Sequence, residues 1–227
     1  MARSMTQTEV VIASHGKLIE GDLSIPADAR GLVIFAHGSG SSRFSPRNRF
    51  VAGVLQKAGL ATLLLDLLTI EEEESERWTR HLRFDIELLS GRLVSARQWA
   101  ATQSDLVRLP VGYFGSSTGA AAALVAASRE SREVHAIVSR GGRPDLAGDA
   151  LPYVRVPTLL IVGGNDEAVI ELNEQAMRQM TCEMELRIVP GATHLFEESG
   201  TLDEVARMAA EWFRDKLGAV QEAELHP

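Results

Sequence analysis

The feature that most constrains the fold is a regular alternation of short apolar runs and longer helical segments after Pro26. Six such runs recur, at residues 32–36, 61–65, 111–114, 136–139, 158–162 and 185–189. Continuous apolar strands separated by helices are typical of a mostly parallel sheet that is covered by helices on both faces. The alternation therefore predicts an α/β fold.

The segments around these runs complete the expected architecture. Residues 9–13 and 18–25 read as two antiparallel strands joined at His15-Gly16, which brings the sheet to eight strands. A helix should begin at the Ser45 N-cap and stop at Gly59, a long helix should fill residues 76–102, and Thr201 with Glu204 has the spacing of a capping box that starts the last helix. Without repeats or linkers, residues 1–227 are expected to form one domain.

Composition excludes several classes of protein. The 227 residues carry 31 acidic and 23 basic side chains, a net charge of −8, which argues against a nucleic-acid binder. The single cysteine, Cys182, allows neither an internal disulfide nor a structural zinc site, and Glu71 to Glu74 lack a matching ligand set, so no metal is expected. The amino-terminal segment lacks the apolar core of a signal peptide and no apolar run could cross a bilayer. We expect a cytoplasmic protein that has no membrane contact and needs no cofactor.

The strongest chemical motif is Gly115-Ser116-Ser117-Thr118-Gly119, which lies between the run at 111–114 and a helix of small residues. A strand, a very tight turn and a helix are the setting in which GxSxG presents a nucleophilic serine, and glycines on both sides provide the room. Ser117 occupies the central position and is the expected nucleophile. Ser116 is the weaker alternative because it lacks the flanking spacing.

A nucleophilic serine needs a histidine base, and the histidine needs a carboxylate to orient it. His194 follows the run at 185–189, where the base belongs if the chain order is serine, acid, histidine. The other histidines precede the serine or occupy less suitable places: His15, His37, His81, His135 and His226. Asp166 follows the run at 158–162 through Gly163-Gly164-Asn165 and is the preferred acid, with Glu167 as the alternative.

The turn His37-Gly38-Ser39-Gly40 follows the run at 32–36. A second backbone N–H is needed at this point to complete an oxyanion hole with the N–H of Thr118, and Ser39 is the expected donor. A simple glycine turn that leads into the next helix is the alternative.

The HG turn at Gly38, GSSTG around Ser117, GGND ending at Asp166 and GATH ending at His194 resemble an α/β-hydrolase over nearly the whole chain. Within that superfamily, HGSGSSR and GGNDE are similar to small dienelactone-hydrolase-like proteins. The resemblance implies an eight-stranded sheet, a Ser-His-Asp triad and an acyl-enzyme. Dienelactone hydrolases proper use a cysteine nucleophile, which Ser117 replaces here. No segment after residue 139 is long enough for a separate cap domain.

Arginines close to the expected site raise the hypothesis of a substrate with an anionic group, because a guanidinium binds carboxylate or phosphate through a planar fork. Arg43 follows the expected oxyanion turn and Arg140 follows a strand, and both are candidate substrate contacts, with surface ion pairing as the alternative.

The sequence predicts a serine hydrolase that cleaves a small carboxylic ester, thioester or lactone. Transfer of the acyl group to an acceptor other than water, as in an acyltransferase or perhydrolase, would use the same triad. A non-catalytic member of the fold that binds a small ligand is the alternative from another class.

Overall fold

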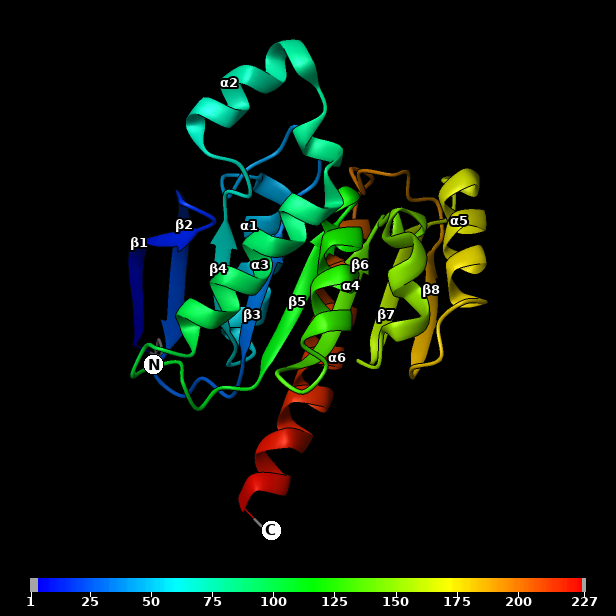
Figure 1. The fold of residues 1–227 in the computed structure, drawn as a ribbon. Coiled ribbons are helices and arrows are strands. Elements are labelled where there is room, and N and C mark those ends of the chain that lie inside the picture. The colour runs from blue at the N-terminus through cyan, green and yellow to red at the C-terminus, as the bar shows by residue number, and fades with distance from the viewer. Residues whose placement is uncertain (1–3, 226–227) are drawn as a thin grey trace.

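A computed structural model describes residues 4–225 as one eight-stranded sheet covered by helices (Figure 1). The strand order is β1-β2-β4-β3-β5-β6-β7-β8, in which β2 is antiparallel to both of its neighbours, β1 and β4, and β3 to β8 are mutually parallel. The predicted fold class and all eight strands are confirmed. The strands are β1 (Met5–Ser14), β2 (Lys17–Pro26), β3 (Leu32–Ala36), β4 (Ala61–Leu65), β5 (Val111–Ser116), β6 (Val134–Arg140), β7 (Thr158–Gly163) and β8 (Met184–Val189).

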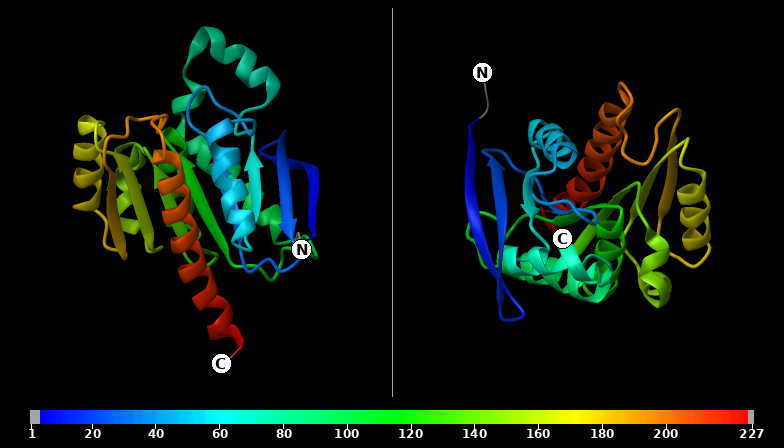
Figure 2. Two further views of the ribbon diagram at one scale, coloured as in Figure 1. Left: turned by 180° about the vertical axis from the view of Figure 1, so that it is seen from behind. Right: turned by 90° about the horizontal axis from the view of Figure 1, so that it is seen from above.

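Helices cover both faces of the sheet (Figure 2). One face carries α1 (Pro46–Lys57) and α6 (Thr201–Leu225), which pack against each other. The other carries α3 (Ile86–Ala100), α4 (Thr118–Arg129) and the 3-10 segment η2 (Pro144–Tyr153), with α5 (Glu167–Met177) beside η2. Two further elements, α2 (Ile70–Thr79) and the 3-10 turn η1 (Leu82–Phe84), connect β4 to α3.

Strand β3 shows how the sheet separates two apolar layers. Val33 and Phe35 pack into the core under α1 and α6, whereas Leu32, Ile34 and Ala36 pack into the core under α3 and α4. Because successive side chains of a strand point to opposite faces, a strand buried on both faces must be apolar at every position. This is the physical reason for the uninterrupted apolar runs in the sequence.

The amino-terminal hairpin has the turn that its sequence predicts. Ser14 pairs with Lys17, and the two turn residues between them, His15 and Gly16, have φ of 50° and 75°. Positive φ at both central residues matches the twist of the flanking strands in a two-residue hairpin. Both strands extend further than the apolar pattern indicated, since their outer ends pair through the backbone and need no apolar side chains.

The prediction of one long helix over residues 76–102 is wrong. Thr69 and Glu72 form a capping box that starts α2, Arg80 ends it at φ 52°, and the Asp85 carboxylate caps α3 by accepting the Leu88 N–H at 2.9 Å. The Thr-x-x-Glu spacing at Thr69 is the signal that the helical pattern of the region obscured.

The last helix begins at Thr201 as expected, but without the expected capping box. The Thr201 hydroxyl donates to the Glu198 carbonyl at 2.7 Å, and the Glu204 N–H donates to the Gly200 carbonyl. Thr201 is the first helical residue rather than the cap, so its side chain satisfies the preceding turn.

Figure 1 shows α2 extending beyond the sheet at the carboxyl ends of the parallel strands. The Glu76 carboxylate fixes this arm. Its side chain is inaccessible to solvent and accepts hydrogen bonds from Arg83 Nε at 2.8 Å, the Leu82 N–H at 2.8 Å and the His81 N–H at 2.9 Å. Burial by itself raises the pKa of Glu76, but the hydrogen bonds from Arg83 and the backbone outweigh it and lower the pKa to about 2.

We expect Glu76→Gln to lower the free energy of unfolding at pH 7 by about 3 kcal/mol, because the change leaves the Arg83 guanidinium without its carboxylate. The native pKa is depressed, so the stabilisation is present above about pH 4.5 and is lost as the pH falls through about 2. Urea unfolding at pH 7 and pH 3 measures both effects. Glu74→Gln, on the exposed face of the same helix, is the control. An equal loss for the two variants would contradict the assignment.

Candidate active site

Ser117 lies on a strained turn between β5 and α4, with φ 50° and ψ −119°. Its N–H donates to the Arg140 carbonyl at 3.3 Å, and its carbonyl accepts the Arg143 N–H at 3.1 Å. A serine with positive φ is uncommon, and such strain persists only where the surrounding structure enforces it. The turn therefore has the backbone form of a nucleophile elbow.

The two flanking glycines are explained by close backbone contacts. A Cβ atom on Gly119 would lie 2.3 Å from the Ala36 carbonyl oxygen, and one on Gly115 would lie 2.4 Å from the Ala120 Cα. Both distances are far below van der Waals contact, and the neighbouring atoms are backbone. Only glycine fits on either side of the serine, as the motif requires.

Ser116, the alternative nucleophile, is buried at the end of β5. Its hydroxyl donates to the Asn48 side-chain oxygen at 3.0 Å. The neighbouring serines therefore differ in setting, since Ser116 packs toward α1 and Ser117 occupies the half-buried apex of the turn.

Asp166 and His194 are joined by a hydrogen bond of 2.7 Å between Asp166 Oδ2 and His194 Nδ1. Asp166 follows the end of β7, and His194 lies on the loop between β8 and α6. Glu167, the alternative acid, is the exposed first residue of α5. The carboxylate that reaches the histidine is that of Asp166.

The histidine loop lies close to the serine turn. A Cβ atom on Gly141 would be 3.5 Å from the His194 ring, and Gly141 directly follows Arg140, whose carbonyl accepts the Ser117 N–H. Glu198 holds the loop by accepting the Thr193 N–H at 3.1 Å. The structure thus brings Ser117, Asp166 and His194 to the carboxyl ends of β5, β7 and β8.

The turn after β3 lies against the serine. A Cβ atom on Gly38 would be 3.1 Å from the Ser117 Cβ, and Gly38, Ser39 and Thr118 line one small hollow together with Arg83. Ser39 is exposed and Thr118 begins α4, whose amino end is the positive end of the helix dipole. Both expected oxyanion donors therefore border the same space.

His37 holds this turn in place. Its Nε2 accepts the Leu67 N–H at 3.0 Å, so the proton of the neutral ring is on Nδ1, which donates to the Gly38 carbonyl at 2.9 Å. Burial lowers the pKa of His37, which favours the neutral form that can accept the Leu67 N–H. His37 is a structural residue of the turn that follows β3.

The remaining histidines lie elsewhere. His15 is in the hairpin turn, His81 follows α2, and His135 is near the amino end of β6. His226 lies outside the described residues.

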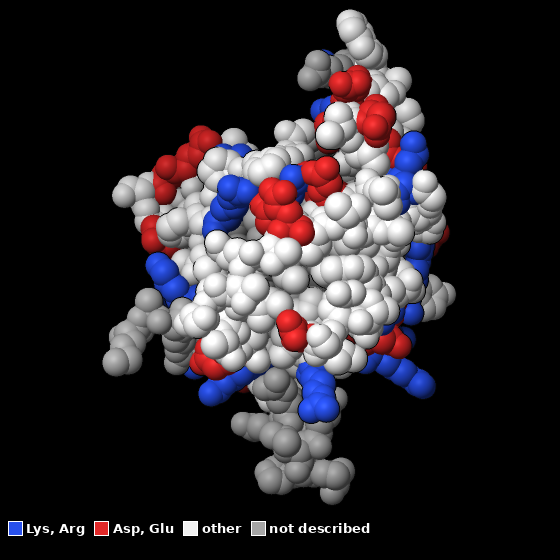
Figure 3. Space-filling view, turned by 90° about the vertical axis from the view of Figure 1, so that its left-hand side faces the viewer, with Lys and Arg blue, Asp and Glu red and all other residues white. Residues whose placement is uncertain are grey.

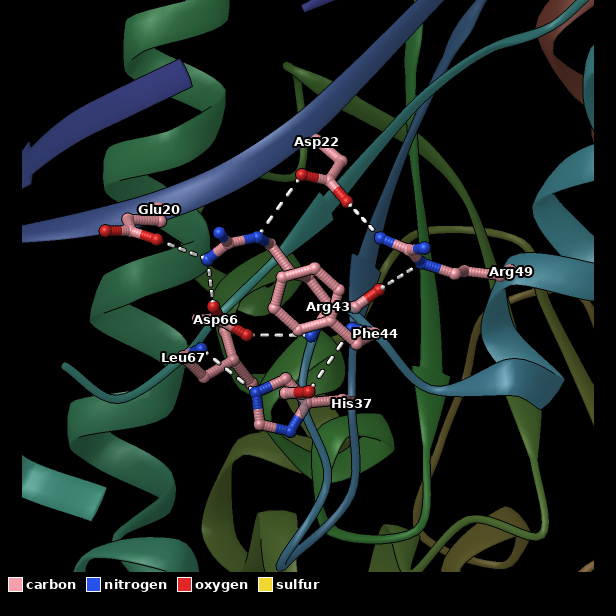
Figure 4. A network of polar contacts seen from close by, with 9 residues as sticks. Glu20, Asp22, His37, Arg43, Phe44, Arg49, Asp66 and Leu67 are labelled. Atoms are coloured by element: carbon pink, nitrogen blue, oxygen red, sulfur yellow. Dashed lines mark hydrogen bonds and ion pairs between the residues drawn. The ribbon is translucent and has the colours of Figure 1, made fainter. Parts of the chain in front are cut away.

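Arg43 is held by ion pairs within the protein, which favours the ion-pairing alternative over the expected substrate contact. Figure 4 shows its guanidinium among three carboxylates: Glu20 at 2.6 Å, Asp22 at 3.2 Å and Asp66. Asp66 also accepts the Arg43 N–H at 2.7 Å. With three carboxylates around it, Arg43 ties the segment after the Gly38 turn to β2 and to the end of β4.

This network lies on the side of the molecule that carries the hairpin. Figure 3 shows acidic and basic side chains next to one another there, in an otherwise largely uncharged surface. Arg49 extends the network by pairing with Asp22 at 2.7 Å. A groove of about 400 Å³ between the hairpin and α1 is lined by Glu9, Asp22 and Arg49, among others, and none of its lining residues belongs to the serine, aspartate or histidine positions.

Asp66 and Asn48 are supporting residues that the sequence pattern did not single out. Asp66 directly follows a buried strand, a position that often carries functional polar groups, and this signal could have identified it. Asn48 is a buried amide in the first turn of α1, and nothing in its sequence context distinguishes it from a surface residue.

Among residues 4–225, no group of three or more histidine, cysteine or acidic side chains is placed to hold a metal ion. Glu72 caps α2 and pairs with Arg92 at 2.8 Å, which accounts for one member of the acidic run. Cys182 is half-buried, and burial raises the pKa of its thiol. Within the same residues, none of the helices is long and apolar enough to cross a membrane.

An eight-stranded, mostly parallel sheet with a serine on a strained strand-to-helix turn and an Asp–His pair at later strand ends defines an α/β-hydrolase fold. The chain belongs to the dienelactone hydrolase family, whose model matches residues 19–222. A dienelactone hydrolase structure from Anabaena variabilis is 57% identical, with a TM-score of 0.91 over 93% of this chain and 98% of that one.

Two other relatives extend the comparison. The esterase Est1E from Butyrivibrio proteoclasticus superimposes with a TM-score of 0.77 over 92% of this chain and 99% of that one, at 17% identity, which shows a shared fold. A Mycobacterium tuberculosis protein whose name marks it provisionally as a phosphoribosyl transferase is 57% identical over 92% of this chain. The chain spans about half of that protein, 46% of its length.

Proposed function

We propose that the protein is a serine hydrolase that cleaves a small carboxylic ester, with thioesters and lactones as related substrates. The observation that carries the proposal is the strained Ser117 turn, which lies between the Gly38 turn on one side and the His194–Asp166 pair on the other. Membership of the dienelactone hydrolase family supports hydrolase chemistry.

Each residue has a defined part in the proposed reaction. The Ser117 hydroxyl attacks the substrate carbonyl while His194 takes its proton and then passes it to the leaving group. Asp166 accepts the hydrogen bond from His194 Nδ1, which fixes the ring orientation and stabilises the imidazolium that forms. The N–H groups of Ser39 and Thr118 stabilise the tetrahedral oxyanion, and water releases the acid from the acyl-enzyme. No step requires a metal or an organic cofactor.

Transfer of the acyl group to peroxide or to an alcohol would use the same residues, and a ligand-binding protein without turnover would have the same fold. The Mycobacterium tuberculosis relative is about twice as long as this chain. Its name describes that longer protein, and the activity proposed for this chain does not rest on it. With one cysteine and no pair to oxidise, we place the reaction in a reducing compartment such as the cytoplasm.

The deciding experiment is to treat the purified protein with a fluorophosphonate and to measure its intact mass. An activated serine should give one covalent adduct, and peptide mapping should locate the adduct on Ser117. Ser116→Ala is the matched control and should still label. The absence of an adduct on folded protein would favour the ligand-binding alternative, and an adduct with peroxide- or alcohol-dependent turnover would favour acyl transfer.

A further inference from the structure

Arg140 is a buried cation that no carboxylate neutralises. Arg140 lies at the end of β6 and is 6% exposed, and its Nη2 donates to the Asn48 side-chain oxygen at 3.3 Å. Its Nε is buried and has no acceptor, and no ion pair involves Arg140 among the described residues. The Phe196 ring, 5.9 Å from the guanidinium carbon, is the only aromatic contact recorded for it within residues 4–225.

The other arginines buried to this degree are neutralised. Arg43 is surrounded by three carboxylates, and Arg92 pairs with Glu72 at 2.8 Å. An unpaired charge in the interior costs several kcal/mol because desolvation has no compensating attraction. Among the described residues, Arg140 therefore differs from the two other buried arginines, whose charges are neutralised by carboxylates.

The groups around Arg140 add positive charge. Arg47 and Asn48 occupy the first turn of α1, which contains no acidic residue and presents the positive end of the helix dipole. Arg47 is near enough to disfavour the charge on Arg140, and burial followed by this repulsion lowers the pKa of Arg140 to about 10. Arg47 Nε is also buried and has no acceptor. Two guanidinium groups and a helix amino end thus converge.

The positive groups of Arg140, Arg47 and the α1 amino end lie next to the proposed nucleophile. The Ser116 hydroxyl and Arg140 Nη2 both donate to the same Asn48 oxygen, and the Arg140 carbonyl accepts the Ser117 N–H. Arg47 pairs with the exposed carboxylate of Glu197 at 3.1 Å, three residues beyond His194. An anion at this position would lie beside the reacting serine and would compete with Glu197 for Arg47.

We propose that Arg140 and Arg47, with the amino end of α1, bind a phosphate group on the substrate. The proposal rests on the proposed function, because it makes the substrate a phosphorylated ester. A phosphate is favoured over a carboxylate because it carries up to two charges and three acceptor oxygens, which match two guanidinium groups at the positive end of the α1 dipole. The Glu197 carboxylate pairs with Arg47, and the phosphate would displace it from that guanidinium group.

Calorimetric titration of the full chain with inorganic phosphate at pH 8, where the dianion dominates, tests the site without turnover. We expect saturable binding that is weakened about tenfold or more in Arg140→Gln and weakened also in Arg47→Gln, because each loses a charge-assisted hydrogen bond. Glu197→Gln removes the competing carboxylate and should tighten binding. Arg207→Gln, an exposed and paired arginine on α6, should change nothing. Acetate should bind far more weakly than phosphate.

Arg140→Gln should unfold in urea at the same or a higher concentration than wild type, since the change removes an uncompensated buried charge. A purely structural role for Arg140 predicts the opposite. The site is refuted if phosphate does not bind wild type, if Arg140→Gln binds it equally well, or if acetate binds as tightly. None of these readouts needs catalysis, so a protein that labels with fluorophosphonate but ignores phosphate refutes this site alone.

Discussion

Replacement of Ser117 by alanine should lower kcat for ester hydrolysis by about a million-fold. Loss of this size is typical when the nucleophile of a catalytic triad is removed, because its members act together. The variant keeps the backbone turn but lacks the hydroxyl oxygen that would form the proposed acyl-enzyme. Steady-state hydrolysis of a neutral aryl ester, compared with the uncatalysed rate, measures the effect.

Ser116→Ala is the matched control for this prediction, because the two hydroxyls are adjacent in sequence but only Ser116 is bonded to Asn48. We expect Ser116→Ala to keep most of the wild-type kcat and to lose a modest amount of stability with its buried hydrogen bond. If the Ser117→Ala protein retained more than a small fraction of the wild-type kcat, another group would be attacking the substrate.

Asp166→Asn should lower kcat by about ten-thousand-fold at neutral pH while the protein remains folded. The amide carries no charge to stabilise the imidazolium, and its NH₂ group can face His194 Nδ1 and favour the wrong tautomer. Initial rates of ester hydrolysis, with circular dichroism as a check of folding, test this expectation.

Glu167→Gln is the control for the aspartate, since Glu167 neighbours Asp166 but is exposed on α5. Its kcat should stay close to wild type. If the two substitutions lowered kcat equally, the 2.7 Å contact between Asp166 and His194 would not be the one that orients the base.

The sheet could be predicted from the sequence because burial on both faces leaves a continuous apolar signature, and strands β3 and β4 match their predicted limits. The placement of Ser117, Asp166 and His194 at strand ends also follows from local information, since each comes directly after a predicted strand. Parallel strands bring their carboxyl ends to one edge, so chain order alone indicated that the three residues would meet.

Features that depend on long-range partners could not be predicted in the same way. The carboxylates around Arg43 come from β2 and from the end of β4, which the sequence places far from Arg43. The break between α2 and α3 depends on how Glu76 binds the chain that follows it, a contact that helical periodicity does not encode.

The ion pairs between Arg43 and the amino-terminal hairpin restrict which substitutions the hairpin can accept. Strands at an edge usually accept substitution easily, because water can replace much of what a neighbouring strand supplied. Here Glu20 and Asp22 on β2 hold the segment that follows the Gly38 turn, through their ion pairs with Arg43. In a mutational library these two acidic positions should tolerate exchange poorly, whereas Val11 and Leu18, exposed on the same hairpin, should accept it freely.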